Sequence, residues 1–182
     1  MYLKKNVIAV IFLFLLVLLS VNVYSDGLYR VNENNIKSFR NVGTGKLYRV
    51  KVTRVIDGDT VEVLTDGKVT GLEARERVRL LGIDTPEIGR EGKEDEKGAK
   101  EALRYLQGLV EGKEVYLAFD WDLRDRYGRL LAYIYLGNGE CVNYRILENG
   151  LGKYLGRFRF QFMGEFQEAE NRAKRGRKGL WR

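Results

Sequence analysis

The stretch KLYRVKVTRVIDGDTVEVL (residues 46–64) contains two β-strand patterns separated by a tight-turn signal. Residues 46–56 alternate in polarity and are rich in valine and tyrosine, which predicts a first strand. DGDT follows, and VEVL after it predicts a second strand. An Asp-Gly pair between two strands is a common hairpin signal, so Asp57 and Asp59 could serve only to build the turn.

The rest of the chain is predicted to form three more strands and three helices. The predicted strands are 76–83, 114–119 and 129–136, and the predicted helices are 94–110, 142–150 and a basic amphipathic helix at 160–179. Five strands with a helix between the third and the fourth is the order of an OB-fold barrel. The predicted class is therefore α+β, in a barrel that commonly binds oligonucleotides or oligosaccharides.

The first 25 residues are predicted to be separate from this barrel. Lys4 and Lys5 precede thirteen apolar residues, 7–19, whereas a bilayer span needs roughly 20. Residues 1–25 therefore resemble a secretory signal peptide, with cleavage after Ser25 and export of the protein. An uncleaved membrane anchor is the alternative, since the residues that follow could extend the span.

The remainder of the chain is predicted to contain one domain. Residues 26–45 are polar and rich in asparagine and glycine, which indicates a linker or flexible arm, and residues 46–182 form the domain. The whole chain has a net charge of +7, which signal cleavage would lower by two lysines. A basic exported domain suggests an anionic partner such as nucleic acid, although solubility alone would also explain the charge.

Histidine is absent from the chain, and Cys141 is the single cysteine. These absences exclude Ser-His-Asp and Cys-His hydrolysis, a histidine general base, an internal disulfide and a thiolate metal cluster. Cys141 lies in an apolar context, which predicts a buried and inert thiol. Any chemistry must therefore use Asp, Glu, Arg, Lys, Tyr, Ser or Thr.

Three segments carry the candidate chemical groups. They contribute Asp57 and Asp59 in VIDGDTVEV, Arg79, Asp84 and Glu87 in RLLGIDTPE, and Arg126, Tyr127 and Arg129 in RDRYGRLLAYIY. Taken singly, these segments could be a hairpin, a helix boundary and a solvated turn. Arg79 is harder to dismiss, because an unpaired charge inside an apolar strand is costly to bury and needs an anionic partner.

Together these residue types suggest phosphodiester chemistry. Carboxylate and carbonyl oxygens suit Ca²⁺ or Mg²⁺. Two arginines can each bind a phosphate through two hydrogen bonds and stabilise the extra charge of its transition state. In the absence of histidine, a glutamate is the natural candidate to activate a water molecule.

In this order, the segments resemble the staphylococcal nuclease (thermonuclease) family. The match covers roughly residues 47–182 and includes DGDT, RLLGIDTPE, the helix 94–110, DRYGRLLAYIY, VNYRILENGLG and KGLW. The resemblance implies a five-stranded OB-fold barrel with three helices and a secreted, Ca²⁺-dependent nuclease acting on single-stranded DNA and RNA. We expect a monomer with no stable protein partner. A non-catalytic OB-fold module that binds nucleic acid, or an envelope-bound interaction protein, is the alternative.

The resemblance also implies a calcium site. The carboxylates of Asp59 and Asp84 and the carbonyl of Thr85 would bind the ion, and Asp57 would lie in its outer coordination shell. Pro86, the only proline in the chain, restricts Thr85 to extended backbone angles. That restriction would direct the Thr85 carbonyl toward the ion.

The catalytic roles follow from the same resemblance. Glu87 would act on the attacking water, and Arg79 and Arg129 would contact the scissile phosphate. Arg126 and Tyr127 match positions near a neighbouring phosphate.

Two local features need the chain to adjust. Strict strand alternation puts Arg79 and Asp84 on opposite faces, so the strand must twist or bulge between them, and Gly82 is the predicted place. The segment after ENGLGK departs from the family pattern, and stacking on a base would fall to Phe158 or Tyr154.

Overall fold

The computed structural model describes residues 47–65 and 72–182. The predicted signal peptide (1–25) and linker (26–45) lie outside the described residues. Within the described ranges, each helix falls short of the length and hydropathy that a membrane span requires.

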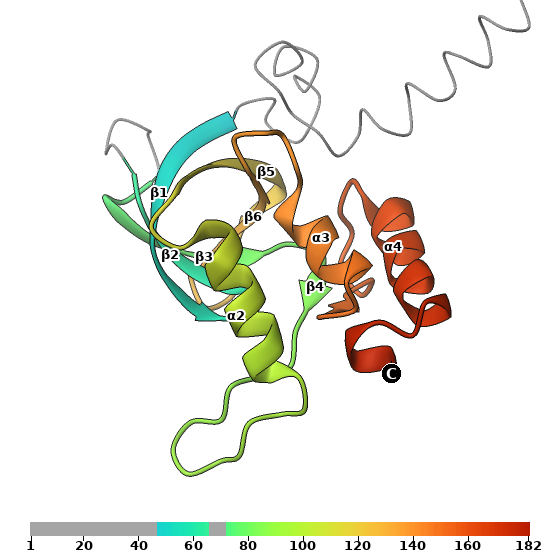
Figure 1. Cartoon of the computed structure of the whole chain (residues 1–182). Helices are drawn as coiled ribbons and strands as arrows, with labels where there is room; N and C mark the ends of the chain where they lie inside the picture. Colours follow the sequence, from blue (N-terminus) through green and yellow to red (C-terminus); the bar gives the residue numbers. More distant parts are fainter. Residues whose placement is uncertain (1–46, 66–71) are drawn as a thin grey trace, which may run out of the picture.

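Five strands close into a barrel, as predicted. They are β1 (Leu47–Asp57), β2 (Thr60–Leu64), β3 (Arg75–Leu80), β5 (Glu114–Arg124) and β6 (Leu130–Tyr135). The order around the barrel is β1-β2-β3-β6-β5, and β1 pairs with β5 to close it. Neighbouring strands are antiparallel except β3 and β6, which are parallel. The fold is therefore the predicted α+β OB-type barrel (Figure 1).

Three helices and a small sheet complete the described part of the chain. They are α2 (Ala99–Val110), α3 (Val142–Glu148), α4 (Met163–Arg175), a 3₁₀ turn (Gly179–Trp181), and the short strands β4 (Ile83–Asp84) and β7 (Lys153–Tyr154). Helix α2 packs against β1, and α3 packs against α4 (Figure 1). The pairing of β4 with β7 joins the segment after the barrel's third strand to the C-terminal helices.

The predicted strand 76–83 is interrupted at the glycine that was expected to redirect it. Strand β3 ends at Leu80, the chain turns, and β4 resumes at Ile83. Gly82 adopts a φ of 78°, which glycine reaches without the penalty that a side chain brings. A Cβ atom there would also lie 2.6 Å from Cζ of Phe160. Both the backbone angle and the packing therefore require glycine.

The predicted element ends differ from the observed ones where long-range contacts intervene. Helix α2 begins at Ala99 instead of residue 94, because residues before it are bonded into a loop. Strand β5 runs to Arg124 instead of residue 119. The predicted C-terminal helix 160–179 is confined to α4, since Phe160 and Phe162 are buried in the core ahead of it.

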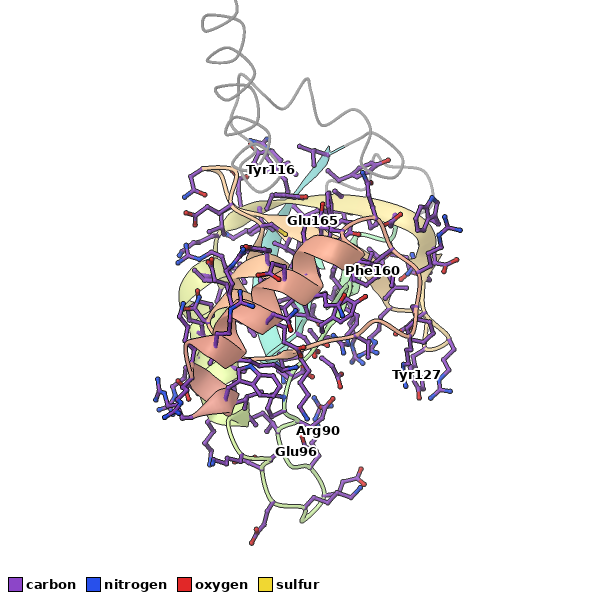
Figure 2. The ribbon with its side chains drawn as sticks, turned by 90° about the vertical axis from the view of Figure 1, so that its right-hand side faces the viewer. Arg90, Glu96, Tyr116, Tyr127, Phe160 and Glu165 are labelled. Atoms are coloured by element: carbon purple, nitrogen blue, oxygen red, sulfur yellow. The ribbon has the colours of Figure 1, made fainter. Side chains whose placement is uncertain are left out.

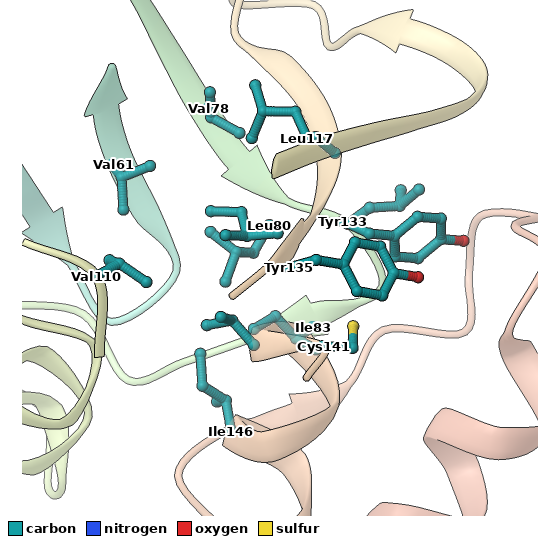
Figure 3. Close-up of a cluster of buried hydrophobic side chains, with 14 of the residues drawn as sticks. Val61, Val78, Leu80, Ile83, Val110, Leu117, Tyr133, Tyr135, Cys141 and Ile146 are labelled. Carbon is teal, nitrogen blue, oxygen red and sulfur yellow. The ribbon is translucent and has the colours of Figure 1, made fainter. Parts of the chain in front are cut away.

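The barrel interior is filled by aliphatic and aromatic side chains from every strand. Figure 3 shows Val61, Val78, Leu80, Leu117, Tyr133 and Tyr135 with Ile83, Val110, Cys141 and Ile146 around them. Full burial of one such side chain contributes roughly 1.5–3 kcal/mol. Cys141 is buried, and burial raises the pKa of its thiol. Because the thiolate is the reactive form, a raised pKa makes this thiol inert. The sequence predicted such a thiol.

Candidate active site

The β1–β2 turn places a carboxylate in the interior. Oδ1 of Asp57 accepts a hydrogen bond from the backbone N–H of Asp59 at 3.2 Å, which stabilises the turn. The side chain of Asp59 is nevertheless only 2% exposed. A Cβ atom on Gly58 would lie 2.6 Å from Oγ1 of Thr85 and 2.7 Å from Cβ of Ala102. DGDT therefore forms the hairpin turn and also buries Asp59 against a second segment.

One arginine joins two carboxylates at this point. Nη1 of Arg79 lies 2.9 Å from Oδ2 of Asp59, and Nη2 lies 2.8 Å from Oδ1 of Asp84. Nη1 also donates to the carbonyl of Ile83 at 2.8 Å. The side chain of Arg79 is 11% exposed and that of Asp84 is 52% exposed. The sequence predicted an anionic partner for Arg79; the β1–β2 turn supplies Asp59, and the turn at Gly82 brings Asp84.

Thr85 fixes the orientation of the buried carboxylate. Its backbone N–H and its hydroxyl donate to Oδ2 of Asp59 at 2.9 and 3.0 Å. Burial raises the pKa of Asp59 to about 7; Arg79 opposes this rise and Asp57 adds to it. A buried carboxylate with a raised pKa is stabilised by a further positive charge, either a proton or a cation.

The oxygen atoms around Asp59 fit a calcium ion. Asp59 and Asp84 offer carboxylate oxygens, and Thr85 adds a backbone carbonyl, which are the hard donors that Ca²⁺ prefers. Within the described ranges, no cluster of three or more acidic, histidine or cysteine side chains is arranged for a metal. Because Ca²⁺ takes 6–8 oxygen ligands, water would have to supply the remainder, and the exposure of Asp84 gives water access.

Asp57 lies beside Asp59 but takes no part in the ion pairs of Arg79 with Asp59 and Asp84. Its Oδ2 is 3.6 Å from Nη2 of Arg90, and its Oδ1 accepts from the turn backbone. It therefore adds negative charge beside Asp59 without sharing Arg79. Its place in the outer coordination shell of a calcium ion stays a prediction.

Glu87 stands at the neck of the loop between β4 and α2. Its backbone N–H donates to Oε2 of Glu96 at 3.1 Å, and the N–H of Glu96 donates to the Glu87 carbonyl at 3.0 Å. The N–H of Gly89 donates to Oδ1 of Asp95 at 2.9 Å. Figure 2 shows Arg90 and Glu96 on this loop, which extends from the body of the molecule. The two hydrogen bonds between Glu87 and Glu96 fix the backbone position of Glu87.

The electrostatic surroundings of Glu87 favour its use as a base. Burial raises the pKa of this carboxyl, the negative charges of Asp57 and Asp84 add to the rise, and Arg79 opposes it. A carboxylate with a raised pKa accepts a proton more readily at neutral pH.

Asp125 orients the second arginine. Its Oδ2 accepts from Nε of Arg129 at 2.8 Å, and its Oδ1 accepts from the backbone N–H groups of Arg129 and Tyr127 at 3.0 and 2.9 Å. Burial alone would raise the pKa of Asp125, but these hydrogen bonds hold it below its usual value. Nη1 of Arg129 lies 3.5 Å from Oγ1 of Thr60 in the DGDT turn. The segment DRYGR is thus connected to the first carboxylate segment.

Arg129 borders two depressions that meet at the site. One cavity of about 510 Å³ is lined by Arg79 and Arg129. A second depression of about 570 Å³ is lined by Glu87 and Arg129. Arg126 and Tyr127 lie at the rim of the first, and Tyr127 projects from the β5–β6 turn (Figure 2). The two depressions therefore share Tyr127 and Arg129, and Arg79 connects the first of them to Asp59 and Asp84.

Comparison with known proteins adds an independent observation. The family model described as "Staphylococcal nuclease homologue" matches residues 77–182. The chain belongs to this family. A thermonuclease of Staphylococcus hyicus is 33% identical over 132 residues, which cover 72% of this chain and 74% of that protein.

Two further relatives show similar identity to this chain. The uncharacterized protein MJ1439 of Methanocaldococcus jannaschii is 34% identical over 170 residues, covering 81% of this chain and 77% of the relative. Endonuclease YncB of Bacillus subtilis is 34% identical over 139 residues, covering 75% of this chain and 63% of YncB.

In this member of the staphylococcal nuclease family, one of the two predicted stacking residues borders the cavity. Phe158 lines it and is 56% exposed. Tyr154 belongs to β7, and its ring packs edge-on against Phe160 at a centroid distance of 6.0 Å. Of the two candidates, Phe158 is therefore the residue available to a ligand in the cavity.

Sequence reasoning missed two aspartates of this nuclease fold. Asp125 orients Arg129, and its signal was an acidic residue at the start of a tight turn. Asp120 is buried and accepts hydrogen bonds from the hydroxyl of Tyr133 at 2.7 Å and from the N–H of Gln161 at 2.7 Å. Its signal was a carboxylate directly after the apolar run LAF.

Proposed function

We propose that this chain is a Ca²⁺-dependent nuclease that hydrolyses phosphodiester bonds in DNA and RNA. The observation that carries the proposal is the bridge from Arg79 to Asp59 and Asp84, with Arg129 lining the same cavity. Membership of the family, and relatives named as a thermonuclease and an endonuclease, support the same activity.

Two guanidinium groups are available for the scissile phosphate. Arg129 is held by Asp125 through Nε, which leaves its terminal amines for phosphate oxygens. Of the two carboxylates paired with Arg79, that of Asp84 is the exposed one. A phosphate oxygen can therefore replace the Asp84 carboxylate on Arg79. Bidentate arginine contacts of this kind stabilise the additional negative charge of a phosphoryl transition state.

Asp59, Asp84 and the Thr85 carbonyl would hold the calcium ion. When bound, the ion would supply positive charge that polarises a phosphate oxygen. A Glu87 carboxylate oxygen takes a proton from the attacking water as the new phosphorus–oxygen bond forms. The bond to the leaving oxygen breaks, and that oxygen takes a proton from solvent water. Arg79 and Arg129 hold the phosphate throughout.

A non-catalytic module that binds nucleic acid is the second candidate function. Such a protein would have no need of a base or of an oriented second arginine. Glu87 is present at the neck of its loop, and Arg129 is fixed by hydrogen bonds from its Nε and its backbone N–H to Asp125. These two features favour the enzyme.

The experiment that tests the proposed function is digestion of single-stranded DNA and of RNA by the purified protein. We expect cleavage of both in millimolar Ca²⁺ and its loss when a chelator is added. The Glu87→Gln protein serves as a control for contaminating nucleases. Full activity of the wild-type protein in excess EDTA would contradict the proposed calcium site.

A further inference from the structure

Exposed aromatic side chains gather on one side of the described structure. Among the described residues, five large hydrophobic side chains are exposed, and all but Leu64 belong to the segment 121–127 or to Phe158. Trp121 is 60% exposed and Tyr127 is 68% exposed. Clustered exposed apolar side chains mark interaction surfaces more often than scattered ones do.

A guanidinium group lies over each of these three aromatic rings. The Cζ atom of Arg159 lies 5.1 Å from the ring centre of Trp121, and that of Arg157 lies 5.0 Å from Phe158. Arg126 lies 4.7 Å from the Tyr127 ring. Alternating rings and guanidinium groups match the alternating bases and phosphates of an unpaired strand, because rings stack on bases while arginines bind phosphates.

Tyr127 and Phe158 line the cavity of the candidate active site, and Trp121, which is outside that lining, is connected to it through Arg159. Arg157, Phe158 and Arg159 line the same cavity as Arg79 and Arg129. The whole lining contains six arginines and three aspartates, and one of those aspartates is ion-paired with Arg129 while another, Asp120, is buried. Three of the arginines are ion-paired as well, Arg79, Arg124 and Arg129. The remaining charges of the lining are Arg126, Arg157 and Arg159 against Asp122, so the charge that faces a ligand is mainly positive, as a polyanion requires.

Asp120 fixes the two segments that carry Trp121 and Arg159. Its Oδ1 accepts from the backbone N–H of Trp121 at 2.9 Å, and its Oδ2 accepts from the N–H of Gln161 at 2.7 Å. The buried carboxylate thus connects β5 to the segment before α4. A stacking surface held in place loses little entropy when a ligand binds.

We propose that Trp121 and Arg159 form a subsite for an unpaired base and its phosphate, away from the nucleotide that is cut. The position of the cut rests on the proposed function, whereas the binding itself does not. A duplex hides the faces of its bases, and a dinucleotide is too short to occupy both regions. The subsite therefore selects single-stranded polymers.

The test is equilibrium binding in EDTA, where no cleavage is expected. A labelled single strand of about 12 nucleotides, within the usual span of such grooves, is compared with the same sequence as a duplex and with a dinucleotide competitor. We expect Trp121→Ala and Arg159→Ala each to raise Kd for the single strand by about 5- to 100-fold, the range measured for one stacked base. The Kd for the dinucleotide should stay unchanged.

Two controls separate stacking from other effects. Trp121→Phe keeps a ring and should bind the single strand within about threefold of the wild-type protein. Leu64→Ala removes an exposed apolar side chain that does not line the cavity, and it should leave Kd unchanged.

Three results would overturn the subsite. They are an unchanged single-strand Kd in Trp121→Ala, an equal loss for the dinucleotide, and tighter binding of the duplex than of the single strand. The Ca²⁺ digestion described above fails or succeeds separately. If the protein cuts DNA and Trp121→Ala leaves Kd unchanged, only the subsite is contradicted. If Trp121→Ala weakens binding and the protein does not cut DNA, only the proposed catalysis is contradicted.

Discussion

Under the proposed mechanism, Arg79 combines a structural and a catalytic role in one side chain. Its guanidinium contacts Asp59, Asp84 and the Ile83 carbonyl, and a lysine ammonium cannot reproduce that planar arrangement. We expect Arg79→Lys to lower kcat by about 10²-fold or more and also to reduce the free energy of unfolding by about 1–3 kcal/mol, because buried acceptors lose a donor. Thermal unfolding followed by circular dichroism, measured beside the kinetics, separates the two effects. Wild-type stability and rate would contradict both roles.

Gly58 is a residue whose importance comes only from packing. In Gly58→Ala, the new methyl group would press on Oγ1 of Thr85 and Cβ of Ala102. Overpacking of this kind costs about 1–3 kcal/mol, and it should also weaken Ca²⁺ binding by displacing Thr85. Calorimetric unfolding and Ca²⁺ titration check this. The matched control is Gly108→Ala in α2, where a Cβ atom meets nothing within 4 Å and should stabilise the helix by about 0.5–1 kcal/mol.

At the scale of elements, one ion pair connects strands that are not neighbours. Arg124 at the end of β5 binds both carboxylate oxygens of Glu76 on β3, at 2.6 and 2.9 Å. Burial alone would raise the pKa of Glu76, but the hydrogen bonds from Arg124 hold it below its usual value. A lowered pKa in the folded protein means that this stabilisation is present at neutral pH and is lost as the pH falls through the folded-state pKa.

Glu76→Gln should therefore remove part of the acid sensitivity. We expect the variant to be less stable than the wild-type protein near neutral pH, by about 1–3 kcal/mol. The gap should narrow below the usual glutamate pKa of 4.5. Urea unfolding at several pH values measures it, with Glu94→Gln on the exposed loop as the control. A gap that is constant with pH would show that the ion pair does not govern this dependence.

The sequence predicted elements well and their ends less well, for an identifiable reason. Alternation and helical spacing are local patterns, so the barrel strands and three helices were correct. The start of α2 depends on the hydrogen bonds between Glu87 and Glu96, and the start of α4 depends on the burial of Phe160. The spacing of apolar residues along a short segment predicts neither of these contacts.

The same distinction applies to the site. The residue types and their order selected the candidate side chains, whose roles stay predictions, and the turn at Gly82 was expected. The bridge from Asp59 through Arg79 to Asp84 required three segments to meet. The orienting role of Asp125 was likewise missed, because it depends on where the side chain of Arg129 points.

For the whole molecule, a basic chain that binds phosphates should be sensitive to salt. Each phosphate contact with a single strand contributes about −0.7 to the slope of log K against log salt concentration. Three to five arginine contacts along the cavity therefore predict a slope of about −2 to −4. Anisotropy titrations with a single strand in EDTA measure it. Affinity that does not change with salt would rule out a phosphate-binding groove.

The signal peptide predicted for residues 1–25 can be tested on the isolated protein. If residues 1–25 are a signal peptide, the protein isolated from its native host should begin near Asp26. Intact-mass measurement decides this directly. A mass that retains residues 1–25 would support the membrane anchor instead.

The measurement that most directly tests the proposed mechanism is the rate of single-strand cleavage in Ca²⁺ by two folded variants. Arg129→Lys keeps the charge but loses the planar fork, and Glu87→Gln keeps the shape but removes the base. We expect kcat to fall by about 10²-fold or more for Arg129→Lys and by about 10²- to 10⁴-fold for Glu87→Gln, while substrate affinity changes little. Wild-type rates in both variants, with folding verified by circular dichroism, would contradict the mechanism.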